Sequence, residues 1–157
     1  MVAQAVPVER RRPLAYRRIV VPLVADVESE TAMALAAELA EDRGTRITAL
    51  VVVEIPAELP LEAHMFKEEA AAKRTLEDAR AIGSARGLNV RTRVLRARLA
   101  GEAIVAEASK AGADLVVLRA PRKQRIGRRG RMFGKTVDHV LKHVPCRVMV
   151  AAPPPSA

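Results

Sequence analysis

The stretch Arg119–His139, RAPRKQRIGRRGRMFGKTVDH, contains the side chains best suited to bind a phosphate group. It ends in Gly134-Lys135-Thr136, a tripeptide that closes many phosphate-binding loops. Seven cations stand within the 13 residues from 119 to 131: Arg119, Arg122, Lys123, Arg125, Arg128, Arg129 and Arg131. Guanidinium groups hold phosphate by paired hydrogen bonds, so this stretch is a candidate site for a nucleotide or another anion. The alternative is a solvated or protein-contacting loop that its own charge repulsion keeps open.

The spacing disfavours a Walker A phosphate loop. That pattern needs a glycine five residues before the Gly-Lys pair, and Arg129 occupies this position. It also needs a strand that feeds directly into the loop, whereas the strand expected here ends at about Arg119.

Other residues of chemical interest lack partners at the required spacing. His139 and His143 have the four-residue spacing of a zinc pair, but no third ligand follows, so we expect surface histidines and no metal site. Glu54 ends a strand beside the expected crevice, where it binds a ribose, caps a helix or faces solvent. We expect Asp114 to be structural and Cys146 to be a packing residue. Without a Gly-x-Ser-x-Gly elbow, a paired-carboxylate cleft or a Cys-x-x-Cys motif, the sequence does not indicate an enzyme.

The net charge of +9, from 27 basic and 18 acidic residues, raises the question of nucleic-acid binding. The aromatic residues Tyr16, Phe66 and Phe133 are too few for a base-stacking surface, which disfavours it. No apolar run approaches the ~18 residues that span a bilayer. A single cysteine precludes an internal disulfide. A reducing interior is the simplest setting for such a chain, so we expect a cytoplasmic protein.

Strands that alternate with helices must position these residues. We expect strands at 17–25, 47–55, 89–97, 114–119 and 146–151, and helices at 30–43, 62–86, 101–111 and 135–144. Ser29 is the expected N-cap of the first helix. Apolar, β-branched runs without alternation are typical of strands buried on both faces. The run 89–97 instead alternates and carries Arg91 and Arg93, as an edge strand does.

This pattern predicts an α/β domain, a five-stranded parallel sheet with helices on both faces. Arginines favour an edge position for the third strand, and the apolar first and fourth strands belong in the middle. The predicted strand order is therefore 3-2-1-4-5. Ligands of such sheets bind at the carboxyl ends of the strands where the order reverses, which are followed here by residues 24–28 and 119–134. The basic stretch thus lies at the expected crevice.

Three segments carry a family likeness: IVVPLVADVESETAMALAAELA, GADLVVL and GKTVDHVLKHVPCRVMV. They resemble the universal stress protein family across nearly the whole chain, and VVEIPAELPLEA adds a likeness to the stress-protein domains appended to amino-acid permeases. The resemblance implies an adenine-nucleotide alpha-hydrolase-like fold with flavodoxin-like layering. It also implies a homodimer joined through the last strand, for which Cys146, Val148 and Val150 are the candidate interface residues. We expect a basic arm at 1–16, the domain at 17–152 and a proline-rich tail at 153–157.

The first signature of ATP-binding members of that family is a Val-Pro-x-Asp-Gly-Ser run after the first strand, whose acid contacts the nucleoside. Aligned through Pro22, that acid falls on Val24 and the serine on Asp26. The acid is therefore missing at its own position, although Asp26 lies two residues further on.

The second signature is Gly-x2-Gly-x9-Gly-Ser/Thr after the fourth strand, where glycines let backbone amides approach phosphates. Its first glycine falls on Arg119 and its second near Arg122, and the loop is about two residues longer here. Gly134 matches, while Lys135 takes the Ser/Thr position and Thr136 follows it. The family's standard ATP site is therefore not intact.

We therefore expect a non-enzymatic regulatory or binding module of the stress response that takes ATP, another adenine nucleotide or another phosphate anion in the crevice. The candidate contact residues are Val24, Asp26, Val53, Arg119, Arg122, Gly134, Lys135 and Thr136. One alternative is a nucleotide-independent protein-interaction module for a membrane transporter, which the permease likeness suggests. Another is a nonspecific binder of nucleic acid or anionic surfaces through the basic loop.

Overall fold

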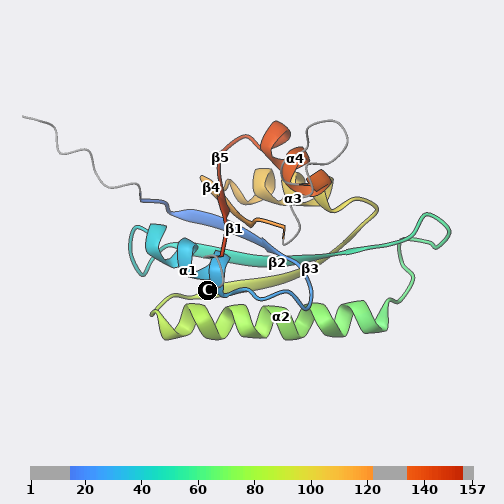
Figure 1. The fold of residues 1–157 in the computed structure, drawn as a ribbon, viewed down its shortest axis with the longest axis horizontal. Helices are drawn as coiled ribbons and strands as arrows, with labels where there is room; N and C mark the ends of the chain where they lie inside the picture. The colour runs from blue at the N-terminus through green and yellow to red at the C-terminus, as the bar shows by residue number, and fades with distance from the viewer. Residues whose placement is uncertain (1–14, 122–133, 154–157) are drawn as a thin grey trace, which may run out of the picture.

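The chain folds as a five-stranded parallel sheet between two layers of helices (Figure 1). The computed structural model describes residues 15–121 and 134–153. In chain order the elements are β1 (Arg18–Leu23), α1 (Glu30–Leu39), β2 (Arg46–Glu54), α2 (Phe66–Ala85), β3 (Val90–Ala97), α3 (Ala100–Ala111), β4 (Leu115–Arg119), α4 (Gly134–His143) and β5 (Arg147–Ala151). The strand order β3-β2-β1-β4-β5 confirms the predicted order.

The two helix layers bury opposite faces of the central strands. Helices α1 and α2 lie on one side of the sheet, and α3 and α4 lie on the other (Figure 1). In β1, Ile19 and Val21 pack in the cluster under α1 and α2, whereas Val20 packs in the cluster under α3 and α4. Because every position of such a strand faces one core or the other, the run is apolar without alternation.

Strand β3 lies at an edge of the sheet, as its arginines predicted. It pairs with β2 from Val90 to Ala97. Arg91 is exposed, while Arg93 forms an ion pair with Glu107 of α3. The charges of this strand are therefore placed where solvent or a carboxylate can satisfy them.

Helix α2 begins at Phe66, later than the predicted start at residue 62. Arg96 at the end of β3 donates hydrogen bonds to the carbonyl oxygens of Leu61 and Ala63, and Arg98 donates to those of Pro56 and Leu59. These bonds hold the β2–α2 connection in a non-helical path and so delay the helix. Within the described ranges, no helix combines the length and apolar character needed to cross a bilayer.

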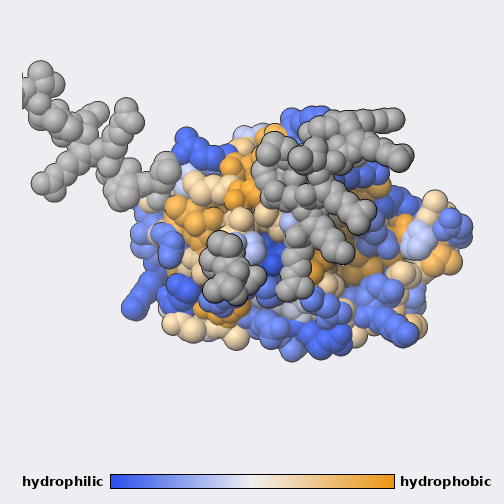
Figure 2. Space-filling model, viewed as in Figure 1, coloured by the Kyte–Doolittle hydropathy of each residue, from blue (hydrophilic) through white to orange (hydrophobic). Residues whose placement is uncertain are grey.

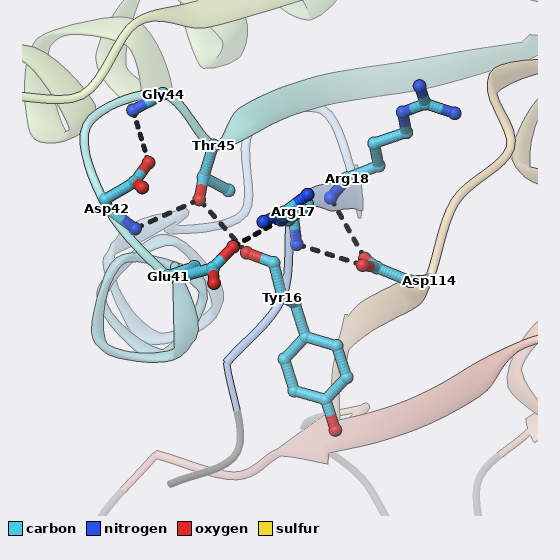
Figure 3. Close-up of polar contacts among 8 residues, drawn as sticks. All are labelled: Tyr16, Arg17, Arg18, Glu41, Asp42, Gly44, Thr45 and Asp114. Carbon is cyan, nitrogen blue, oxygen red and sulfur yellow. Dashed lines mark hydrogen bonds and ion pairs between the residues drawn. The ribbon is translucent and has the colours of Figure 1, made fainter. Parts of the chain in front are cut away.

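Asp114 joins the amino-terminal ends of β1 and β4, at the end of the sheet opposite the carboxyl ends of the strands (Figure 3). Its carboxylate accepts hydrogen bonds from the backbone N–H groups of Arg17 and Arg18 at 2.9 and 3.0 Å. The side chain of Thr45 donates to the carbonyl oxygen of Tyr16, whose ring is buried beside the sheet. The structural role predicted for Asp114 is confirmed.

Candidate functional site

A cleft of about 860 Å³ opens at the carboxyl ends of β1, β2 and β4, where the strand order reverses. Its walls come from the loop after β1, the end of β2, the first turns of α2 and α3, the loop after β4 and the start of α4. Seven of the eight candidate residues line it: Val24, Asp26, Val53, Arg119, Gly134, Lys135 and Thr136. The eighth, Arg122, lies outside the described residues, as does the rest of the basic run to Arg131.

The loop after β1 presents the apolar side chain of Val24 to the cleft, and the carboxylate of Asp26 in this loop contacts α2. Val24 is 67% exposed. Asp26 adopts a left-handed backbone conformation with a φ of 61°, and its N–H donates to the Thr75 hydroxyl at 3.0 Å. Its carboxylate lies 3.4 Å from the guanidinium of Arg74 on α2. Asp26, which could replace the acid missing at the Val24 position, is thus paired with Arg74.

Glu28 and Arg119 form an ion pair between the loop after β1 and the end of β4. The distance from Arg119 Nε to Glu28 Oε1 is 2.6 Å, and the side chains are 11% and 39% exposed respectively. Both residues line the cleft. Arg119 stands at the first glycine position of the family pattern. At this position the chain therefore has a guanidinium group that is already paired with the carboxylate of Glu28.

Ser29 takes the N-cap position of α1 that the sequence predicted, but Glu28 supplies the side-chain cap. Its carboxylate accepts hydrogen bonds from the N–H of Thr31 at 3.0 Å and from the Thr31 hydroxyl at 2.8 Å. Ser29 is buried, has helical backbone angles and makes no side-chain cap. Burial raises the pKa of Glu28, but the hydrogen bonds from Arg119 and Thr31 outweigh it and lower the pKa from 4.5 to about 2.

The amino-terminal end of α4 forms the other side of the cleft. Gly134 has a φ of 82°, a region that disfavours side chains, and a Cβ added there would lie 3.7 Å from Cγ of Pro121. Lys135 is exposed and Thr136 half-buried, and both line the cleft. A helix start carries partial positive charge and N–H groups without partners in the helix, so it attracts anions.

The end of β2 supplies apolar surface and an open backbone edge. The β1–β2 ladder stops at Leu23–Val51, whereas the β2–β3 ladder continues to Glu54–Ala97. Among the residues that the structure describes, the β1 side of β2 therefore has no strand partner beyond Val51, and it borders the cleft beside Val53. Glu54 accepts a hydrogen bond from the N–H of Ala100 at 3.1 Å, which favours its capping role over ribose binding.

The remaining titratable candidates lie outside the residues that line the cleft. His139 and His143 stack with ring centroids 4.3 Å apart. In the part of the chain that the structure describes, no group of three or more His, Cys, Asp or Glu side chains is placed to hold a metal ion. Cys146 is half-buried just before β5, and burial and the charge of Asp114 raise the pKa of its thiol.

Residues 15–152 match the model of the universal stress protein family. The chain belongs to this family. No curated protein was found to match this universal stress protein.

Solved structures share its fold. A universal stress protein from Archaeoglobus fulgidus has a TM-score of 0.70 at 22% identity, over 87% of this chain and 98% of its own. The structure of the Archaeoglobus fulgidus universal stress protein in complex with dAMP gives 0.67 at 20% identity over the same shares. One from Lactobacillus plantarum gives 0.67 at 24% identity, again over 87% and 98%.

The sequence located the cleft and most of its candidate residues but missed Glu28. The sequence contains a signal for this ion pair, because the acid Glu28 follows the first strand and a run of basic residues begins at the end of the fourth strand. What the sequence does not give is which of several cations the acid contacts.

Proposed function

We propose that this universal stress protein is a non-enzymatic module that binds an adenine nucleotide in the cleft. The observation that carries the proposal is the pairing, in one cleft, of apolar surface at the ends of β1 and β2 with the amino-terminal end of α4. Its volume of about 860 Å³ is in the range of small-molecule sites. The dAMP complex of the Archaeoglobus fulgidus protein, which has the same fold, gives further support.

The base would lie on the apolar side of the cleft and the phosphates at α4. Val24 and the open edge of β2 near Val53 offer apolar contact and backbone hydrogen bonds to a base. The N–H groups at the start of α4, the ammonium group of Lys135 and the hydroxyl of Thr136 offer donors to phosphate oxygens. No carboxylate stands at the Val24 position for the ribose, so we expect binding to depend mainly on the phosphates.

Replacement of Lys135 tests this function. Lys135→Ala should weaken ATP binding at least about tenfold, because a charge-assisted hydrogen bond contributes roughly 1.5–3 kcal/mol. Lys142→Ala removes an exposed lysine from the far end of the same helix and serves as the matched control. Isothermal titration calorimetry with ATP and AMP measures both variants. Equal affinities of Lys135→Ala and Lys142→Ala for ATP would contradict the proposed site.

The homodimer remains part of the proposal. β5 pairs with β4 on one side and presents half-buried Val148 and Val150, while Cys146 lies just before the strand. Continuation of the sheet across a two-fold axis would cover these apolar side chains. Val148→Asp should therefore give monomers in sedimentation velocity, with wild-type protein as the dimeric reference. A dimer that persists in this variant would refute the interface.

Partner-protein binding is the second candidate function. Leu59, Leu61 and Phe66 are exposed large apolar side chains in and beside the β2–α2 connection, which Arg96 and Arg98 hold in place. In Figure 2 hydrophobic residues are visible among hydrophilic ones at the right-hand end of the molecule, where Figure 1 places the β2–α2 connection. The transporter suggested by the permease likeness, and the cytoplasmic location, remain predictions. Recovery of a transporter by the wild-type protein without nucleotide, and its loss in Phe66→Ser, would favour this function.

A further inference from the structure

The cleft already contains an anion of its own, the carboxylate of Glu28. Arg119 is the last residue of β4, and Leu115 and Val117 of this strand pack in the cluster under α1 and α2. Side chains two residues apart on a strand share a face, so Arg119 extends toward the same layer. Glu28 meets it there, just before α1.

Arg119 donates hydrogen bonds to the Glu28 carboxylate and to the carbonyl oxygen of Ala120, and the carboxylate is the acceptor that a ligand phosphate can replace. Its guanidinium is largely buried and contacts Glu28 at 2.6 Å and the carbonyl oxygen of Ala120 at 3.3 Å. A buried guanidinium needs an anionic partner. A phosphate group satisfies it as well as a carboxylate does, because each offers two oxygens that can accept paired hydrogen bonds from a guanidinium.

Glu28 has a second set of partners that it keeps when Arg119 is withdrawn. The N–H and hydroxyl of Thr31 donate to its two oxygens, and its side chain is 39% exposed. The carboxylate also stands at the start of α1, where the helix dipole favours negative charge. Release of Glu28 from Arg119 therefore does not leave a buried charge without partners.

We propose that Glu28 is an internal competitor of the cleft, and that a ligand phosphate binds by displacing its carboxylate from Arg119. This inference rests on the proposed nucleotide function and adds a residue that sets ligand selectivity. Because the competitor acts on Arg119 alone, it lowers affinity for phosphate-bearing ligands and leaves affinity for a neutral nucleoside unchanged.

The test compares Glu28→Gln with wild-type protein by calorimetry, with ATP and adenosine as ligands. Removal of the charge should raise ATP affinity about two- to fivefold, the range of a partly exposed ion pair, with adenosine affinity unchanged. Glu30→Gln is the matched control, since Glu30 lies on the first turn of α1 and pairs with Arg86 away from the residues that line the cleft. In an Arg119→Lys background, which keeps a cation but loses the paired geometry, the gain should shrink.

The possible results distinguish the competitor role of Glu28 from nucleotide binding itself. Wild-type binding of ATP without a gain in Glu28→Gln would overturn the competitor and leave nucleotide binding intact. An equal gain for ATP and adenosine would indicate general loosening of the cleft and also overturn it. Failure of wild type and Glu28→Gln alike to bind ATP at millimolar concentration would overturn both proposals. Thermal unfolding of each variant verifies that the fold is retained.

Discussion

The ion pair between Glu28 and Arg119 predicts how the stability of the domain changes in acid. The pKa of Glu28 lies at about 2 in the folded protein, below the ordinary value of 4.5. A carboxyl group with a lowered folded pKa stabilises the native state above its unfolded pKa, and the contribution disappears as pH falls through the folded value. The contribution of Glu28 should therefore be complete at pH 6 and decline between about pH 4.5 and pH 2.

The expected magnitude is about 1 kcal/mol. One pKa unit corresponds to about 1.4 kcal/mol, but Glu28 is 39% exposed, and solvent screens such pairs strongly. Urea denaturation of wild type and Glu28→Gln at pH 6 and pH 3 measures the difference in unfolding free energy. That difference should be about 1 kcal/mol at pH 6 and smaller at pH 3. A difference that is the same at both pH values would refute the reasoning, because it could not come from ionisation of Glu28.

Three further substitutions test the contacts that hold the fold together. Asp114→Ala should lower the unfolding free energy by about 2–3 kcal/mol, because two backbone N–H groups lose a charged acceptor. Urea denaturation measures this loss, and Asp78→Ala, which removes an exposed carboxylate, is the control. Gly83→Ala should lower the unfolding free energy by about 1–2 kcal/mol, because the new Cβ would lie 2.2 Å from Cγ2 of Val90. The better helix propensity of alanine offsets part of that strain. Equal melting temperatures of Gly83→Ala and wild type would contradict this prediction. Arg98→Ala should speed proteolysis between residues 55 and 65, whereas Arg91→Ala should not, since Arg98 binds carbonyl oxygens of that connection.

The sheet was predictable because its requirements are local in sequence. Strands buried on both faces need unbroken apolar runs, and those of β1 and β4 are clear to read. The edge position of β3 followed from Arg91 and Arg93, since charges are tolerated where one side of the strand has no partner. The strand order then determined where the cleft must open.

The details of the cleft were less predictable because they depend on contacts between distant residues. Arg96 and Arg98 set the start of α2 through hydrogen bonds to carbonyl oxygens some 33–42 residues away. Ser29 occupies the N-cap position of α1, but Glu28 supplies the side-chain cap because Thr31 and Arg119 together hold its carboxylate. Local propensity favours serine at a cap, and nothing local reveals an arginine 91 residues away.

The closeness of Pro121 and Gly134 has a consequence for how this domain can diversify. A Cβ at Gly134 would be 3.7 Å from Cγ of Pro121, so the chain two residues after β4 and the first residue of α4 lie together among the residues that line the cleft. A change in the number of residues between these two points would therefore not require β4 or α4 to move. The β4–α4 junction is thus a place at which the sequence and the length of the chain can change while the sheet keeps its strand order.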